Sequence, residues 1–523
     1  MNISAEYIEI LITVVIFETK PLLWHMKIVP YKLLKPSITQ TICIILLFLV
    51  FYPVFFADYV YTDEAHQLWY NDDNTNFIMF FETGRGLNAL IMQKLFPALK
   101  NISELKWVRV ISFAGWVLAI IVWNVILNNW KKIFNLNEHW AFFLSICLPC
   151  SITVAIVIGW AVHAAVFLAF IFALVSGHLL FIHFYNRKDL RISPVRIIAV
   201  VLLGLGSLFL YQPMFGAFLL PFFLYHLNNR YKKIDRVMYI GVGFYLAVCL
   251  LYFILFKYLL AAYNMGASDR SVLSVHPLEK VSFFFSQPLA HAFSFNFLYN
   301  MHGIFSQAFY PLMLATWLFS VFAFDKEQKV IYKFAYIVRV LLLMMLIYVF
   351  VLLPRENFSA YRTMLCLNLA GTMLLTDAII RLFSKSKIKN IIPYLACGIV
   401  VVVAWFNFNL NYINPLKKEY QAVHTYFQRN YDSSKTTIYF VRPPDNLFKK
   451  RYNQNVYKDE FGLPSTHKDW TPEPLMRQMV LEATGNREKA RRTTIINLPF
   501  EERDSARAEP GSLVIDVEKV LVD

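Results

Sequence analysis

The sequence predicts a polytopic α-helical membrane protein with about eleven membrane-spanning helices and a small α/β domain at its C-terminal end. Of its 523 residues, 58% are hydrophobic and 17% aromatic, whereas only 16% are charged. A soluble protein of this length needs a much larger charged surface. The net charge of +15 comes from Lys and Arg in short segments between apolar runs, which is typical of membrane proteins and indicates no nucleic-acid partner.

Eleven apolar runs account for the predicted membrane helices. They are residues 40–57, 107–128, 140–157, 162–184, 197–211, 213–228, 237–261, 307–323, 333–353, 363–383 and 391–410. Residues 197–228 are too long for one helix across a core of about 30 Å. Because Pro213 can end one helix and begin the next, we expect two short segments here. They place the basic segments 187–196 and 230–236 on the same side of the membrane.

The distribution of Lys and Arg predicts the orientation of the chain. The basic connecting segments face the cytoplasm, so the N-terminus lies inside and the C-terminal domain lies outside after an odd number of crossings. The outer face then receives the loops 58–106 and 262–306, the turn 354–362 and the tail after 411. Any function that needs polar side chains from several segments is therefore expected on that face.

The chain divides into three parts. Residues 1–39 form a cytoplasmic or interfacial N-terminal segment, residues 40–410 the transmembrane domain, and residues 411–523 an extracytoplasmic domain. Strand-like runs at 436–442, 493–498 and 512–517, with helical patterning at 414–429 and 473–484, predict a small α/β fold for the last part. The sequence has no P-loop, GxGxxG, Ser-elbow or HExxH pattern, so known nucleotide-binding loops are not indicated.

Carboxylates follow directly on the first apolar run. Asp63 and Glu64 lie in a turn rich in Tyr and Trp, which suits a general base acting on a sugar hydroxyl at the membrane surface. Asp72 and Asp73 follow, either as part of an acceptor or metal site or as a solvated turn. Behind them, the apolar spacing of residues 87–96 predicts an amphipathic helix on the membrane surface.

A second candidate group lies in the short outer turn 354–362. Arg355 and Arg362 are basic residues on the side of the membrane where basic residues are scarce, and Glu356 lies beside them. A planar guanidinium group binds two phosphate oxygens at once, so the two arginines of this turn can hold a phosphate or diphosphate. The alternative is an Arg–Glu pair that only closes the turn.

Three short patterns resemble the GT-C superfamily of membrane glycosyltransferases and, within it, the GtrII-type glucosyltransferases that modify bacterial O-antigen. The patterns are Gly84-Arg85-Gly86-Leu87 behind the acidic turn, Leu210-Tyr211-Gln212-Pro213-Met214-Phe215-Gly216 in the broken run, and Glu356 with Tyr361-Arg362-Thr363 in the outer turn. The acidic motif after the first helix, the surface helix and the outer α/β domain are also similar to that superfamily. Its paired acidic residues correspond to Asp63 and Glu64, whereas Gly86 stands where Pro is usual.

The resemblance implies an inverting glycosyltransferase of the bacterial inner membrane and cell envelope. The donor would be a sugar such as glucose on a polyprenyl phosphate, and the acceptor a lipid-linked or surface glycan such as the O-antigen of lipopolysaccharide. Asp63 or Glu64 would be the base, with Asp63 preferred, while Arg85, Arg355, Glu356, Tyr361 and Arg362 would bind the substrate and its phosphate. No cofactor is required, although the four carboxylates of the first loop supply enough oxygen ligands for Mg²⁺ or Mn²⁺.

Two other classes of protein compete with this interpretation. A ligase or polymerase of lipid-linked glycans is expected to carry its basic residues in one large late outer loop. A transporter or flippase of such glycans needs polar groups across the bilayer, and charges inside the apolar runs are scarce. Two of them, Arg339 and Asp377, are expected to pair with each other.

Overall fold

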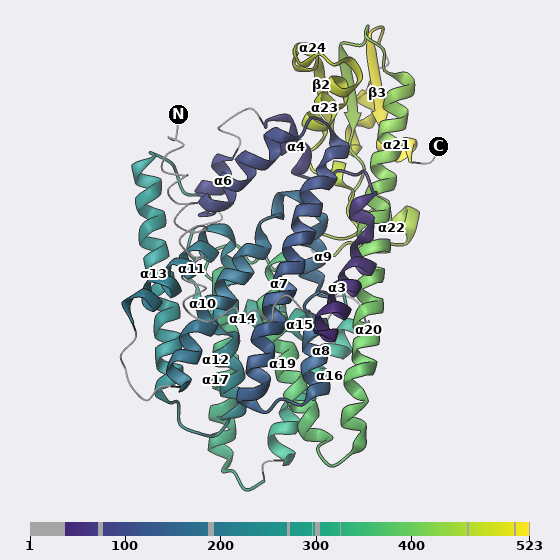
Figure 1. Cartoon of the computed structure of the whole chain (residues 1–523). Coiled ribbons are helices and arrows are strands. Elements are labelled where there is room, and N and C mark those ends of the chain that lie inside the picture. The colour runs from purple at the N-terminus through teal and green to yellow at the C-terminus, as the bar shows by residue number, and fades with distance from the viewer. Residues whose placement is uncertain are drawn as a thin grey trace.

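The computed structural model describes residues 37–71, 77–186, 193–268, 272–294, 297–298, 304–324, 326–457, 460–506 and 509–521. The chain forms a bundle of long helices with a small lobe at one end, which we call the lobe end (Figure 1). The long helices are α3 (Ile38–Phe51), α7 (Leu105–Phe134), α10 (Val166–Asn186), α11 (Pro194–Tyr211), α13 (Arg236–Ala262), α16 (Ile304–Phe324), α17 (Val330–Ile347), α19 (Leu365–Leu382) and α20 (Ile392–Phe406). Shorter helices α8 (Glu138–Cys147), α9 (Ile152–Gly159), α12 (Leu220–Asn228) and α18 (Val349–Leu352) complete the bundle.

Local sequence signals set several helix starts. Ser37 and Gln40 form a reciprocal capping box at the start of α3, and Ser193 caps α11 directly before Pro194 at its first position. The Asp235 side chain caps α13 in the same way. These caps satisfy backbone N–H groups that the helix itself leaves without partners.

A row of tryptophans joins α7 to the middle of the bundle. Trp116, Trp123 and Trp130 recur every seven residues on one face of α7, and all three are fully buried. The first two rings contact Phe170 of α10, and the Trp130 indole donates a hydrogen bond of 3.1 Å to His178 of the same helix. This spacing keeps large side chains on the same side of a helix, so the row forms one continuous packed seam.

Within the described residues, ten segments are long and apolar enough to cross a membrane, not the eleven that the sequence predicted. The difference lies in residues 194–228, where α11, a 3₁₀ segment (Gln212–Leu219) and α12 form one continuous apolar run of 35 residues. The run still turns back on itself. Arg196 at its start contacts His183, and Tyr225 near its end lies 6.1 Å from Tyr185, both of these partners being near the end of α10.

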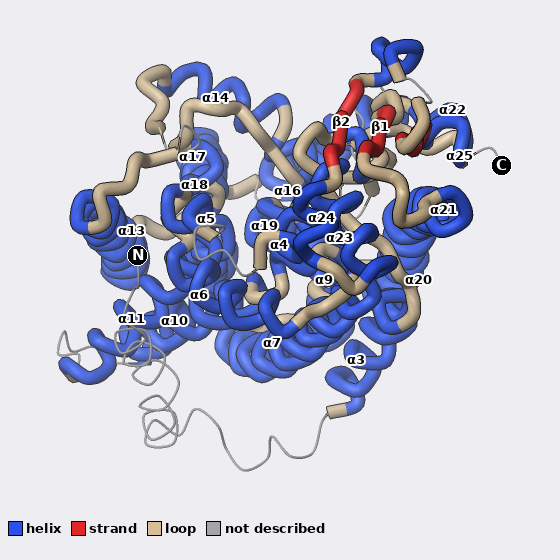
Figure 2. Tube along the Cα trace, turned by 90° about the horizontal axis from the view of Figure 1, so that it is seen from above, coloured by secondary structure: helices blue, strands red, loops and turns tan. Residues whose placement is uncertain are grey.

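Further short helices connect the long ones. They are α4 (Glu64–Trp69), α5 (Ile78–Glu82), α6 (Gly86–Leu95), α14 (Pro277–Ser286) and α15 (Pro288–Phe293). Figure 1 labels α4 and α6 at the lobe end and α14 and α15 about half-way along the bundle, and the view from above shows α5 beside α6 (Figure 2). The helix expected over residues 87–96 is therefore present as α6, which packs on α11.

The C-terminal lobe, residues 414–521, is built on a three-stranded parallel sheet with the order β2-β1-β3. Its strands are β1 (Thr437–Val441), β2 (Thr494–Leu498) and β3 (Ser512–Asp516), with Thr437 paired to Thr494 and to Ser512. The helices of the lobe are α21 (Asn414–Asn430), α22 (Leu447–Tyr452), α23 (Pro472–Thr484), α24 (Arg487–Arg492) and α25 (Val517–Val520). A π-helical segment, Asn407–Ile413, joins α20 to α21, so one long helix runs from the bundle into the lobe (Figure 1).

Candidate active site

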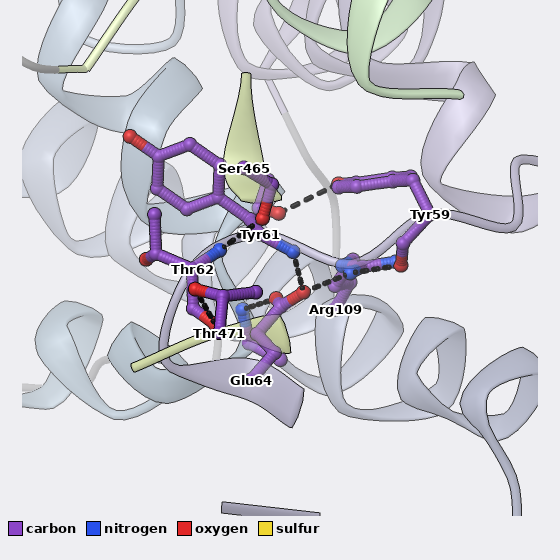
Figure 3. A network of polar contacts seen from close by, with 9 residues as sticks. Tyr59, Tyr61, Thr62, Glu64, Arg109, Ser465 and Thr471 are labelled. Carbon is purple, nitrogen blue, oxygen red and sulfur yellow. Dashed lines mark hydrogen bonds and ion pairs between the residues drawn. The ribbon is translucent and has the colours of Figure 1, made fainter. Parts of the chain in front are cut away.

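The acidic turn is strained and is held in place by the lobe. Thr62 has a φ of 37°, a left-handed conformation that β-branched residues rarely adopt. Its N–H donates to the Ser465 hydroxyl at 2.6 Å, and its carbonyl accepts from the Thr471 hydroxyl at 3.4 Å (Figure 3). Two lobe residues therefore fix the backbone next to Asp63 and Glu64.

Glu64 is turned into the bundle, where it is completely buried. One of its oxygens accepts hydrogen bonds from Arg109 Nη2 at 2.5 Å and from the Tyr61 N–H at 2.7 Å, and the other accepts from the Ala161 N–H at 2.6 Å (Figure 3). Burial raises the pKa of the Glu64 carboxyl, and Arg109 opposes that shift. Since both oxygens are used and none is accessible, Glu64 ties α4 to α7 and is badly placed to take a proton from a substrate.

Arg109 completes this buried pair. Its guanidinium lies 3.5 Å from the centre of the Tyr59 ring and donates to the Tyr59 carbonyl at 3.0 Å. A buried charge is tolerated only when it is paired and hydrogen-bonded, and Arg109 meets both conditions. The pair therefore fixes the exit of the chain from α3 to the start of α4.

Asp63 is the carboxylate of the turn that remains partly accessible. It is half-buried, and its Oδ1 accepts a hydrogen bond of 2.8 Å from the indole N–H of Trp470 in the lobe. It precedes α4 but makes no capping hydrogen bond with that helix. Of the two acidic residues that the sequence left as alternatives, Asp63 is the one whose geometry suits a general base.

Arg85 brings two of the quoted sequence patterns together. Its guanidinium lies 4.7 Å from the centre of the Tyr211 ring, and its Nε donates to Gln212 at 3.3 Å. The Gln212 amide in turn donates to the Thr83 carbonyl and to Tyr252, both at 2.8 Å. A broken apolar run and a loop more than 120 residues earlier therefore meet at the lobe end.

Gly84 makes that meeting possible. It has a φ of 77°, and a Cβ at this position would lie 2.1 Å from the Tyr252 hydroxyl. The Tyr252 hydroxyl donates to the Gly84 carbonyl at 3.1 Å, which closes the turn against α13. A side chain at residue 84 would push Arg85 away from Tyr211.

Arg362 reaches the same region from the turn before α19. Its Nη1 pairs with Glu460 of the lobe at 2.8 Å, and Glu460 also accepts the Tyr361 N–H at 2.5 Å. Burial disfavours the charged guanidinium, but the combined effects of Glu460, Tyr211 and Tyr61 outweigh burial and raise the pKa of Arg362 overall. The arginine therefore keeps its positive charge, although it is mostly buried.

Aromatic rings fill the space between Arg85 and Arg362. The Arg362 guanidinium lies 5.1 Å from the Trp160 ring, the His163 ring packs on Trp160 at 4.4 Å, and the Tyr211 ring packs on His163 at 5.4 Å. Both arginines lie close enough to act electrostatically on His163 and on Tyr211. The buried Tyr211 hydroxyl has no hydrogen-bond partner among the described residues. Arg85 and the Glu460-paired Arg362 thus lie on either side of one buried phenol, and guanidinium groups of this kind can bind an anion.

The other residues predicted for the site lie elsewhere. The side chains of Arg355 and Glu356 are exposed, and Lys280 binds their backbone carbonyls at 3.0 and 3.3 Å. Asp72 and Asp73 lie outside the described residues. Among the residues that the structure describes, no group of three or more His, Cys, Asp or Glu side chains is arranged to hold a metal ion.

The prediction that Arg339 and Asp377 pair with each other is wrong. Asp377 binds Arg230 and Arg381, the latter at 2.7 Å, whereas Arg339 donates to the carbonyls of Ala335 and Lys232 at 3.0 Å. The turn after α12 brings Arg230 closer to Asp377 than the neighbouring helix brings Arg339. None of these contacts involves a residue of the candidate site.

Three residues of the site escaped the sequence analysis. Arg109 left a usable signal, because a lone arginine inside an apolar run indicates a buried partner. Glu460 and Trp470 left none, because charged and aromatic residues are ordinary in a polar tail. Only the docking of the lobe on the bundle gives them a place in the site.

The fold defines the class of the molecule as a multi-pass helical membrane protein, with ten candidate membrane segments in the described residues. No protein-family model matches the chain, and comparisons with curated proteins and with solved structures likewise found no match.

Proposed function

We propose that this protein is a membrane glycosyltransferase of the GT-C type that uses a polyprenyl-phosphate-linked sugar as donor. The acceptor is a lipid-linked or surface glycan on the periplasmic face of the bacterial inner membrane. The observation that carries the proposal is the cluster of Arg85, Arg362 and the unpartnered Tyr211 hydroxyl at the lobe end of an apolar bundle. A lipid phosphate is an anion that reaches its binding site from the membrane, and the two arginines at the end of the apolar bundle can bind it there.

The proposed reaction is a single in-line displacement with inversion. Asp63 takes the proton of the acceptor hydroxyl, whose oxygen forms a bond to the anomeric carbon of the donor. The bond from that carbon to the phosphate oxygen breaks, and the polyprenyl phosphate leaves with the electron pair. Arg85 and Arg362 stabilise the charge that develops on the leaving phosphate, and the Tyr211 hydroxyl donates a hydrogen bond to it.

The remaining contacts support the roles of these residues without touching the substrate. Glu64 and Arg109 hold the start of α4, and Glu460 holds the turn that carries Arg362. Preorganised charges need no rearrangement when the leaving group becomes negative, so a rigid scaffold of this kind favours the transition state. Gln212 contributes by orienting Arg85 towards Tyr211.

The proposal is tested with the full chain reconstituted into liposomes. Polyprenyl-phosphate glucose with a radiolabelled sugar is supplied together with a lipid-linked glycan pool from bacterial membranes, and incorporation of label into glycan is measured. Incorporation that is inhibited by added polyprenyl phosphate supports the proposal. Polyprenyl phosphate binding that is equal in the wild type and in an Arg85→Gln, Arg362→Gln double variant would contradict it.

A further inference from the structure

One side of α4 carries the accessible residues of the acidic turn. Glu64, Ala65, Gln67, Leu68 and Trp69 are all buried, so this helix is packed on most of its surface. The three positions that remain half-buried are Asp63, His66 and Tyr70. Spacings of three and four residues place them along a single helical face, and the rings of His66 and Tyr70 lie 4.6 Å apart.

The lobe extends this face at the Asp63 end. Trp470 donates its indole N–H to Asp63 at 2.8 Å, yet the side chain is still 46% exposed. A tryptophan of this size is costly to leave in water, and its polar atom is already used. Lys468 Nζ lies 5.7 Å from the centre of the ring, and the exposed remainder of the ring surface is available to a ligand beside Asp63. We call Trp470, Asp63, His66 and Tyr70 the α4 strip.

We infer that the α4 strip is the binding site for the acceptor glycan, with Trp470 as the platform on which a sugar ring stacks. The inference rests on the proposed function, because it takes Asp63 as the base. The acceptor oxygen must come within about 3 Å of that carboxylate to lose its proton. The sugar units next to the reacting hydroxyl must then lie on the residues that flank Asp63.

The chemistry of the strip matches a carbohydrate. A sugar has apolar C–H faces, which pack on aromatic rings, and polar edges, which bind carboxylate and imidazole groups. Trp470 and Tyr70 supply the rings, while Asp63 and His66 supply hydrogen-bonding groups between them. Arg85 instead contacts Tyr211 and Gln212, so in this proposal the donor phosphate and the acceptor glycan are held by different elements.

Binding and transfer are measured separately to test this inference. The full chain in lipid nanodiscs is titrated with oligosaccharides released by mild acid from bacterial lipopolysaccharide, using saturation-transfer difference NMR. Trp470→Ala is expected to weaken binding about tenfold, the usual scale for loss of an aromatic contact. Trp470→Phe keeps a ring but loses the N–H to Asp63, so it is expected to bind the oligosaccharides well while the kcat of transfer falls.

A matched variant separates a local effect from damage to the fold. Trp107 is 58% exposed at the start of α7, and Trp107→Ala is expected to leave binding unchanged. Wild-type protein that fails to bind the oligosaccharides, equal binding by Trp470→Ala, or equal loss in Trp107→Ala would each overturn the inference. Binding that depends on Trp470 without any sugar transfer would support the glycan site and contradict the proposed transferase instead.

Discussion

Glu460 and Arg362 form an ion pair of 2.8 Å between the C-terminal lobe and the turn before α19, although 98 residues separate them in the sequence. The carboxylate is fully buried and also accepts the N–H of Tyr361. The lobe is therefore part of the site and not an appendage, because it holds one of the two arginines that the proposed reaction needs.

Removing the Glu460 carboxylate should destabilise the protein. Glu460→Ala leaves a mostly buried guanidinium and a backbone N–H without an acceptor, and breaking such a pair costs about 3–5 kcal/mol. The side chain of Glu460→Gln can still accept the hydrogen bond from the Tyr361 N–H, so this variant should lose less stability. Thermal unfolding in detergent measures both, and a Glu460→Ala variant with the Tm of the wild type would show that the contact is not formed.

Glu64 and Arg109 should behave as one unit. Either Glu64→Gln or Arg109→Met leaves a buried group without its charged partner and should lower stability by about 3–5 kcal/mol. The double variant should cost less than the sum of the two single changes, because neither charge then remains alone. The free energy of unfolding of the wild type, the two single variants and the double variant, measured by chemical denaturation, gives the interaction energy of the pair. Additive losses would mean that the two side chains do not interact.

Arg85 should act on donor binding. Arg85→Gln removes a charge-assisted contact worth about 1.5–3 kcal/mol, which corresponds to about a 10- to 150-fold rise in the KM for the polyprenyl-phosphate donor. Lys94→Gln serves as the control, because it removes an exposed charge at the end of α6, the helix that begins directly after Arg85. Equal changes in the two variants would indicate a general electrostatic effect and no specific phosphate contact.

Glu482 should make the docking of the lobe depend on pH. Burial raises the pKa of its carboxyl above the ordinary 4.5, although hydrogen bonds from Gln478 and from the Ile102 N–H lower it. The folded protein thus favours the protonated form, and this stabilisation is present below the unfolded pKa and lost as pH rises through the folded pKa. Stability of the wild type should fall over that window, whereas Glu482→Gln should show a flatter profile in thermal unfolding at several pH values.

The sequence predicted the features that depend on local pattern. Alternating apolar residues marked β1, β2 and β3 to within about one residue of their observed ends, and the apolar spacing behind the acidic turn marked α6. Residues 194–228 form one continuous apolar run, because composition alone does not show that a 3₁₀ segment joins the two predicted helices. The run nevertheless turns back on itself, as two short segments would.

The site depends on contacts that no local pattern encodes. Asp63 and Glu64 are neighbours with the same chemistry, but the start of α4 turns one towards Trp470 and the other towards Arg109. Arg355 and Arg362 looked equivalent in one short turn, yet only Arg362 enters the bundle, because Glu460 of the lobe is there to pair with it. Such choices follow from tertiary packing between segments that are distant in the sequence.

The most direct test of the proposed reaction replaces Asp63 by Asn and measures sugar transfer in liposomes. The Asn side chain has the same shape and still accepts the indole N–H of Trp470, so the turn should keep its structure. Transfer should fall by about 10²- to 10⁴-fold, the usual contribution of a general base, while Glu104→Gln at the same end of the molecule should leave it unchanged. Wild-type rates of transfer by the Asp63→Asn protein would contradict the account.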